Sequence, residues 1–185
     1  VDERLRTLEE QLAAAAQQAP YREPVGWLRC FRGIDTVTAL TVVTELHGFE
    51  RFESARDLMA YLGLVPSERT SAEHPRRGGI TKAGNHRVRR LLVEAAWHYR
   101  HRPGVGAALR KRRVDQPGHI IAIAEKAQQR LHRRYWKLLD ARSKPPNQAV
   151  IAVARELAGF VWAALHRPAD DCAASPGYGF GLCGE

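Results

Sequence analysis

Residues 62–97 read LGLVPSERTSAEHPRRGGITKAGNHRVRRLLVEAAW, and this stretch divides into two unlike parts. The first part, residues 64–85, holds two prolines and three glycines and predicts a loop. The second part begins at Asn85, a residue type that favours the N-cap of a helix. Apolar residues then recur every three or four positions, which predicts an amphipathic helix with one buried stripe: Val88, Leu91, Leu92, Ala95, Ala96 and Tyr99.

The segment before this stretch predicts a helical hairpin. A helix runs from Leu28 towards Gly33, the chain turns, and a second helix starts near Thr36. This is the pattern of a helix-hairpin-helix, in which hairpin amides such as those of Gly33 and Ile34 can bind a DNA phosphate. Asp35 would repel a phosphate there. Two interpretations therefore stay open, a DNA contact or a turn kept for packing.

The outer parts of the chain also predict helices. Residues 1–19 carry the alternating spacing of three and four that marks a coiled-coil seam, and Pro20 and Pro24 interrupt it. Ser54 and Asp57 form a capping-box pattern that opens a short helix ending at Gly63. Two further helices are expected, one starting near Pro117 and one capped by Asn147.

Together these segments predict an all-α fold. It has a helix-hairpin-helix-like start, then a compact helical domain, and an N-terminal coiled-coil stub. The expected organisation is the end of a coiled coil at 1–19, a linker at 20–27, a helical domain at 28–167 and a disordered tail at 168–185. The chain begins without Met inside a helix, so we expect a piece of a longer protein.

Positive charge is concentrated in one stretch. The chain has 29 Lys and Arg against 20 Asp and Glu, a formal net charge of +9. Between Arg69 and Arg113 there are 13 Lys or Arg and only two acidic residues, Glu73 and Glu94. Such a stretch predicts a polyanionic partner. A second basic strip, at Arg130, Arg133, Arg134 and Lys137, fits either a backbone-contacting face or a solvated one.

Several other classes of site receive no support. The three cysteines, Cys30, Cys172 and Cys183, lack the spacing of a disulfide framework or a zinc site, and no metal site is expected in this chain. No P-loop or dinucleotide-binding pattern occurs, and no apolar run reaches the length of a membrane span. The four tryptophans lie at irregular intervals and are assigned to the core.

The loop and the start of the helix after it carry the groups that could handle a phosphodiester. Arginine can bind phosphate oxygens in a bidentate way, and a hydroxyl can bind phosphate or attack it. These residue types alone fit a phosphate-binding loop or a catalytic one. The predicted phosphate-binding residues are Arg69, Arg76, Arg77, Thr81, Lys82, Asn85, Arg87, Arg89 and Arg90.

An ordered series of motifs carries a resemblance to a known family. It comprises Gly33 with Thr38-Ala39, Arg51-Phe52, Ser54-Ala55-Arg56, the run from Tyr61 to Pro66, Ser71, Gly79-Ile80-Thr81-Lys82, Gly84-Asn85 and the run from Leu91 to Ala96. From about Leu28 to Trp162 the chain resembles the C-terminal domain of bacterial transposases of the insertion-sequence 110/116/902 family. Ala72, Glu73 and Asp35 depart from the family pattern.

The resemblance implies a function in DNA transposition or site-specific recombination. It implies that Ser71 attacks DNA and forms a covalent serine–DNA linkage. A RuvC-like N-terminal domain, missing from this chain, would bind a divalent metal such as Mg²⁺ through four carboxylates. The implied partners are DNA, a structured guide RNA and a second copy joined through the coiled coil, with no membrane.

These expectations place the protein in the bacterial cytoplasm, associated with the nucleoid. The chain in isolation is expected to bind DNA without completing transposition. The alternative is a non-catalytic DNA- or RNA-binding module, or the remnant of a decayed mobile element.

Overall fold

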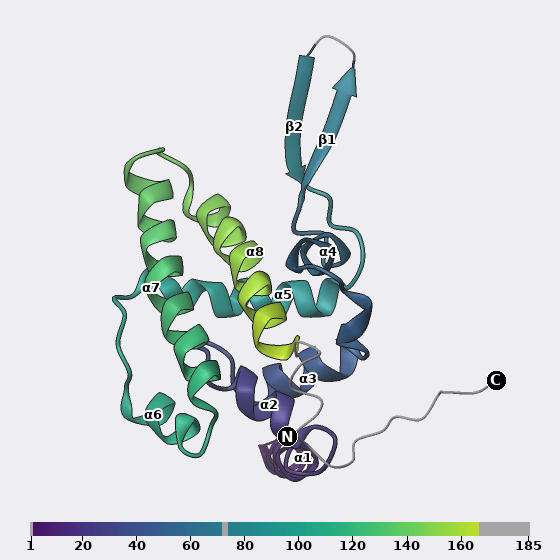
Figure 1. The fold of residues 1–185 in the computed structure, drawn as a ribbon, viewed down its shortest axis with the longest axis vertical. Coiled ribbons are helices and arrows are strands. Elements are labelled where there is room, and N and C mark those ends of the chain that lie inside the picture. The colour runs from purple at the N-terminus through teal and green to yellow at the C-terminus, as the bar shows by residue number, and fades with distance from the viewer. Residues whose placement is uncertain (1, 72–73, 167–185) are drawn as a thin grey trace, which may run out of the picture.

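The computed structural model describes residues 2–71 and 74–166, and this part of the chain is built almost wholly from helices (Figure 1). The all-α prediction is thus confirmed, with one small β-hairpin added. The elements in chain order are α1 (Asp2–Ala15), α2 (Arg22–Leu28), α3 (Thr36–Leu46), the 3-10 helix η1 (Phe49–Arg51), α4 (Ala55–Tyr61), β1 (Pro66–Ser71), β2 (His74–Ile80), α5 (His86–Ala96), the 3-10 helix η2 (Trp97–Arg100), α6 (Ala107–Arg113), α7 (Gly118–Asp140) and α8 (Pro146–Leu165). The predicted tail, 168–185, lies outside the described residues.

The core forms where α8 packs on three other helices, α4, α5 and α7 (Figure 1). The predicted stripe of α5 supplies Val88, Leu92, Ala95 and Ala96 to this core, all buried. Burying one large aliphatic side chain contributes about 1.5–3 kcal/mol. α8 is long and apolar enough to cross a membrane by composition, but half of its most apolar window is buried inside this body. A core helix explains that composition.

Helix starts follow the predicted capping residues in most cases. Asn85 accepts a hydrogen bond from the amide of Val88 at 3.0 Å, and Ser54 and Asp57 form the predicted capping box. Pro117 precedes α7, as predicted. The prediction for α8 was wrong in one respect, because the helix starts at Pro146 with Pro145 at the N-cap, which places Asn147 inside it. Proline suits this first turn since its missing N–H has no partner there.

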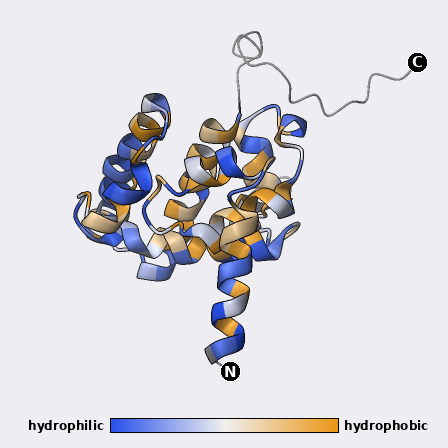
Figure 2. Ribbon diagram, turned by 90° about the horizontal axis from the view of Figure 1, so that it is seen from below, coloured by the Kyte–Doolittle hydropathy of each residue, from blue (hydrophilic) through white to orange (hydrophobic). Residues whose placement is uncertain are grey.

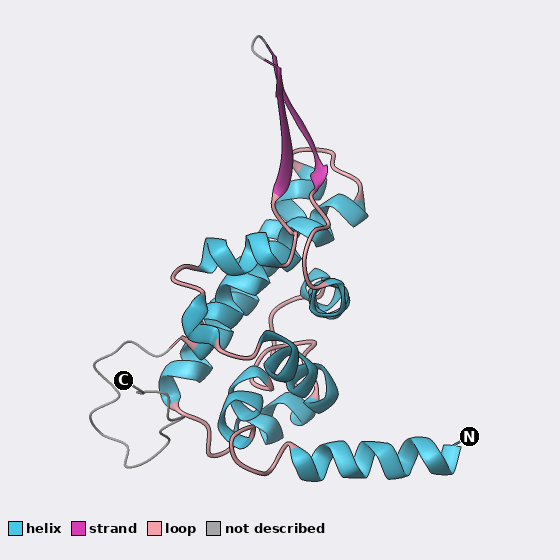
Figure 3. Cartoon of the chain, turned by 90° about the vertical axis from the view of Figure 1, so that its right-hand side faces the viewer, coloured by secondary structure: helices cyan, strands magenta, loops and turns pink. Residues whose placement is uncertain are grey.

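α1 projects from the helical body as a separate rod (Figures 2 and 3). Leu5 and Leu8 on the predicted seam are 53% and 54% exposed, and Leu12 is also exposed. The helix ends at Ala15 rather than at Ala19, and Ala16 is buried in the core cluster. Residues 22–27 of the predicted linker belong to α2, whose Val25 and Leu28 are buried.

The prediction of a loop over residues 64–85 was wrong. Most of this segment forms an antiparallel hairpin, in which Pro66 pairs with Ile80 and Ser71 pairs with His74. The pairing shifts register between Pro66 and Glu68. The sequence lacks the alternation of apolar residues that marks a strand with a core face. The reason is visible in Figures 1 and 3, where the hairpin rises away from the body and has no core to face.

Two glycines fix the root of this hairpin, which is the crossing of residues 61–65 with residues 81–85. Three backbone hydrogen bonds join the segments: the amide of Thr81 to Val65 at 2.9 Å, that of Lys82 to Gly63 at 3.1 Å and that of Asn85 to Tyr61 at 3.3 Å. Gly63 and Gly84 have φ of +63° and +69°. A Cβ on Gly84 would lie 1.8 Å from the Tyr61 carbonyl oxygen, so no other residue fits without movement.

We therefore expect Gly84→Ala to lower the free energy of unfolding by about 2–4 kcal/mol, through backbone strain and the collision with Tyr61. Gly79→Ala is the matched control, because a Cβ at Gly79 would meet nothing within 4 Å. Its effect should stay within about 0.5 kcal/mol. Urea unfolding of the two variants measures both values, and equal stabilities would contradict the close crossing at the root.

Candidate nucleic-acid interface

The hairpin places Ser71 as far from the helical body as the described chain reaches on that side (Figure 3). Ser71 is the last residue of β1 and pairs with His74, the first residue of β2. Arg69 pairs with Arg76, two positions along the ladder. At about 3.3 Å per residue, the seven residues of β2 give the hairpin a length of roughly 20 Å.

This geometry divides the predicted phosphate-binding residues into three groups. Arg69, Arg76 and Arg77 lie on the hairpin with Ser71, whereas Thr81 and Lys82 lie at its root. The remaining residues, Asn85, Arg87, Arg89 and Arg90, begin α5. Along the ladder, Arg76 lies two positions from the Ser71–His74 pair, whereas Lys82 lies beyond the opposite end of the hairpin.

Ser67 has a structural role on the hairpin. Its hydroxyl donates to the carbonyl oxygen of Gly79 at 3.0 Å, across the two strands. The bond lies near the register shift, where a regular ladder bond is lost. Gly78 leaves space for this hydroxyl, since a Cβ there would approach the Ser67 oxygen to 2.5 Å.

A carboxylate from α3 holds the start of α5. Glu45 accepts from the Asn85 side-chain amide at 2.8 Å and from Arg87 at 3.1 Å. The hydrogen bond from Asn85 lowers the pKa of Glu45, and Arg87 lowers it further. Asn85 thus uses its amide on Glu45 and its carbonyl oxygen on the helix cap, whereas the Arg87 side chain stays 70% exposed.

Arg89 turns inward rather than towards solvent. One guanidinium nitrogen donates to the carbonyl oxygens of Leu62 and Ala83, both at 2.8 Å. These carbonyls belong to the two segments of the hairpin root, so the side chain fastens the root to α5. Arg90 is 77% exposed and makes a long ion pair with Glu94 at 3.6 Å. Around the hairpin root and the start of α5, the exposed cations among the described side chains are Lys82, Arg87 and Arg90.

The turn at Gly33 is packed against the body. A Cβ on Gly33 would lie 2.7 Å from the Ala95 carbonyl oxygen of α5, and Ile34 is fully buried. Asp35 accepts from the amide of Thr38 at 2.7 Å and so caps α3. These contacts show that the turn packs against the body, which is one of the two interpretations. A DNA contact at this turn stays a prediction.

Part of the basic surplus is likewise bound inside the molecule. Arg112 donates to the Ile34 carbonyl oxygen at 2.5 Å, and burial is the main cause of a lowered pKa for its guanidinium. Arg113 is buried, where it donates to the Cys30 carbonyl oxygen at 3.2 Å and pairs with Glu125 at 3.2 Å. Counting charges along the sequence therefore overstates the positive charge available to a ligand.

Across residues 2–71 and 74–166, no three His, Cys, Asp or Glu side chains come together as metal ligands.

Comparison with known proteins identifies the family. Residues 27–109 match the family model for the transposase IS116/IS110/IS902 family. The chain belongs to this transposase family. The match begins near the end of α2 and ends within α6, so it includes the hairpin and α5.

Three curated relatives are also similar to the transposase chain. A Sinorhizobium fredii protein designated a transposase, y4qE, is 52% identical over 136 residues, which cover 74% of this chain and 35% of the relative. The transposase for insertion sequence element IS1533 of Leptospira borgpetersenii is 35% identical over 77% of this chain and 42% of its own length. The transposase for IS1111A of Coxiella burnetii is 28% identical over 90% and 38%. The chain thus spans about two fifths of the length of these relatives.

The structure gives a physical reason for two of the sequence motifs that point to this transposase family. The run from Tyr61 to Pro66 and the pair Gly84-Asn85 form the two sides of the hairpin root. The glycines serve close contact of backbone with backbone. At Gly84 the close neighbour is the Tyr61 carbonyl oxygen.

Because Arg89 points inward, we expect its replacement to change the stability of the fold. Arg89→Ala should lower the free energy of unfolding by about 1.5–3 kcal/mol, because two carbonyls lose a charged donor. Arg90→Ala removes the same charge from an exposed position and should change stability by less than about 0.5 kcal/mol. Chemical unfolding distinguishes them, and a stable Arg89→Ala variant with weakened DNA binding would instead make Arg89 a DNA contact.

Proposed function

We propose that the chain is the DNA-handling part of a transposase, in which the projecting hairpin presents Ser71 to a DNA phosphodiester. The observation that carries this proposal is the position of Ser71 at the far end of β1, clear of the helical body (Figure 3). A nucleophile that must reach a phosphate within a duplex needs to extend beyond the surface that supports it. A hairpin of roughly 20 Å meets that need.

The proposed step is a transesterification at phosphorus. The Ser71 hydroxyl loses its proton to a base, and its oxygen forms a bond to phosphorus. One P–O bond of the strand breaks, and the released sugar hydroxyl takes up a proton. The covalent serine–DNA linkage conserves the bond energy, so a second strand end can reverse the step and complete the exchange.

Arginines on the same hairpin support the step. Arg69 and Arg76 occupy paired positions on the ladder two steps from Ser71. Guanidinium groups near a reacting phosphate stabilise the negative charge that develops on its oxygens. The exposed cations at the base of the hairpin, Lys82, Arg87 and Arg90, would hold neighbouring backbone phosphates.

The remaining parts of the activity are proposed from the family resemblance. A divalent metal would be held by a RuvC-like domain outside this chain, where it would activate a phosphodiester. DNA is the proposed substrate and a structured RNA the proposed guide. The proposed setting is the bacterial cytoplasm at the nucleoid.

Ser71→Ala, placed in the complete reading frame that encodes this chain, should abolish the covalent protein–DNA adduct and leave DNA affinity unchanged. Ser67→Ala is the matched control, since its hydroxyl bonds to Gly79 within the hairpin and the adduct should survive. Denaturing gels detect the adduct. An adduct that persists in Ser71→Ala would sink the assignment, and DNA binding without any adduct in the unaltered protein would favour a non-catalytic binding module.

Duplex affinity is the control readout for both variants. With about 5 to 8 phosphate contacts, the logarithm of the affinity should fall with the logarithm of salt concentration with a slope of roughly −5 to −7. A DNA affinity that does not change with salt concentration would contradict a surface that binds backbone phosphates.

We also propose that α1 joins two copies of the chain. Its seam residues Leu5, Leu8 and Leu12 are exposed along a helix of 14 residues that projects from the body. Two such helices could bury the three leucines against each other, and their short length predicts a weak dimer.

Leu8→Asp should shift this dimer to monomer, because it places a charge in the seam. Thr7→Asp adds the same charge to the same helix away from the seam and should leave the dimer intact. Sedimentation across a concentration series measures the shift. A monomer at all concentrations in the unaltered chain would contradict the proposal.

A further inference from the structure

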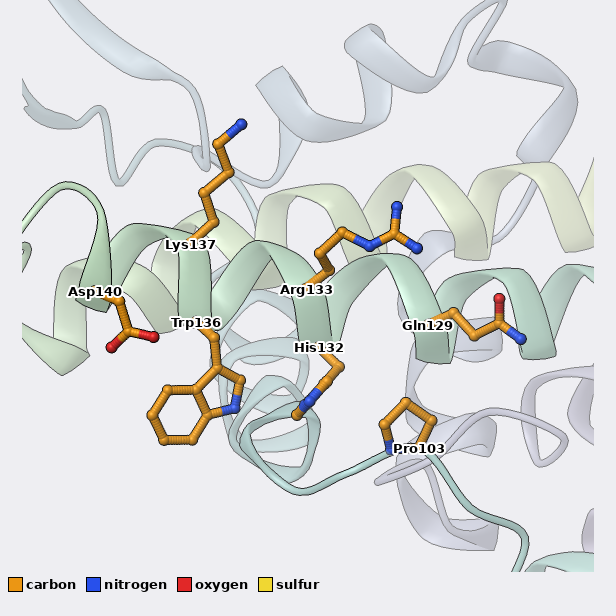
Figure 4. A pocket seen from close by; sticks show the side chains of 7 residues that line it. All are labelled: Pro103, Gln129, His132, Arg133, Trp136, Lys137 and Asp140. Carbon is orange, nitrogen blue, oxygen red and sulfur yellow. The ribbon is translucent and has the colours of Figure 1, made fainter.

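A cleft of about 560 Å³ lies along the exposed side of α7, far from the hairpin in the chain (Figure 4). It is a shallow hollow that is open to solvent. Two sides of α7 and the segment after η2 line it: Pro103, Gln129, His132, Arg133, Trp136, Lys137 and Asp140. Figure 4 shows Arg133 and Lys137 along one side of the helix, with His132 and Trp136 along the other.

Trp136 is the unusual member of this cleft. It was assigned to the core from the sequence, and that assignment was wrong, since it is 43% exposed. The other three tryptophans, Trp27, Trp97 and Trp162, are partly buried against the core. An indole left open to solvent on a globular surface needs an explanation.

The Trp136 ring is held in a fixed orientation. Its Nε1 donates to the Arg100 carbonyl oxygen at 3.0 Å. Tyr135 and His132 meet it edge to face, with ring centroids 5.5 Å and 6.4 Å away. His132 is itself fixed by a hydrogen bond from Nδ1 to the Tyr99 carbonyl oxygen at 3.1 Å. A ring with its polar edge satisfied and its orientation set can offer a face for stacking.

The cations of α7 fall into two classes. Arg130 and Arg134 both pair with Glu156 of α8, at 2.9 Å and 3.1 Å. Arg133 and Lys137 line the cleft, are exposed, and form no ion pair within residues 2–71 and 74–166. Glu156 thus neutralises Arg130 and Arg134, whereas Arg133 and Lys137 stay available to a ligand.

We propose that this cleft binds an unpaired nucleotide of a nucleic-acid strand, with the base stacked on Trp136 and the adjoining phosphate held by Arg133 and Lys137. An indole face takes any base, and it requires one that has left its own stack. Paired bases in a duplex stay within their own stack and therefore cannot stack on Trp136. Asp140 at the end of the cleft repels phosphate and so limits where the backbone can run.

The proposal goes beyond the action of Ser71 and does not depend on it. The cleft lies on α7 and the segment before α6, whereas the proposed nucleophile lies on the hairpin. A single-stranded region of DNA or of RNA supplies the same chemistry, an exposed base next to a phosphate.

The test measures binding of fluorescently labelled oligomers to the full 185-residue chain. The probes are a 12-nucleotide deoxythymidine strand, a 12-nucleotide uridine strand and a DNA duplex of equal length. Trp136→Ala should weaken binding of at least one single strand by about 5- to 150-fold and leave duplex affinity unchanged. Trp136→Phe, which keeps an aromatic face, should restore most of the loss. The strand that loses affinity identifies the source.

Charge variants test the phosphate contact without disturbing the ring. Arg133→Ala combined with Lys137→Ala should weaken single-strand binding and reduce its salt slope by about 0.7, the value for the one phosphate that they hold. Arg130→Ala is the matched control, because it removes one charge already paired with Glu156. Asp140→Asn should tighten binding, an effect that a purely structural residue would not produce.

Two outcomes would overturn the proposal. Unchanged single-strand affinity in Trp136→Ala, with circular dichroism showing a folded chain, would exclude the stacking. Equal loss on duplex and single strand would show a general charge or folding effect. If Trp136→Ala fails to fold, the Trp136→Phe variant and the double variant at Arg133 and Lys137 are compared instead. Affinity changes that are equal for single strands and duplex in these variants would also overturn the proposal.

Discussion

The backbone crossing at the hairpin root is the constraint on which the candidate site depends. Gly84 passes so close to the Tyr61 carbonyl that the two segments can only lie in one arrangement. Arg89 then joins both segments to α5, and Asn85 serves at once as the end of the root and the cap of that helix. A single contact region thus connects α4, the hairpin and the central helix.

The distribution of positive charge shows how one residue type serves two purposes. Arg89, Arg112 and Arg113 bind backbone carbonyls and hold the fold together. Guanidinium groups suit this use because a planar fork can reach several acceptors from one position. Only the cations that remain exposed can meet a polyanion, and among these are Lys82, Arg87 and Arg90 near the hairpin root and Arg133 and Lys137 on α7.

Most helices could be predicted from the sequence, and the hairpin could not. Helix positions follow from capping residues such as Ser54 and Asn85 and from apolar spacing, which are local signals. The strands of the hairpin carry no alternating apolar pattern, and Pro75 with the glycines that follow it resembles a loop. The exposure of Trp136 could not be predicted from the sequence either, because it depends on which side of α7 packs against α8. The family motifs predicted Ser71 as a candidate but gave no indication of how far it stands from Lys82.

The rigid root has a mechanical consequence for the projecting hairpin. The strands join the helical body at the crossing of Gly63 with Gly84 and at Ile80, which packs against the core, so the hairpin would pivot at this end. A small tilt of α5 relative to α4 would be magnified at the far end, where Ser71 lies. Any DNA that presses on the basic start of α5 could therefore steer the position of the distant hydroxyl.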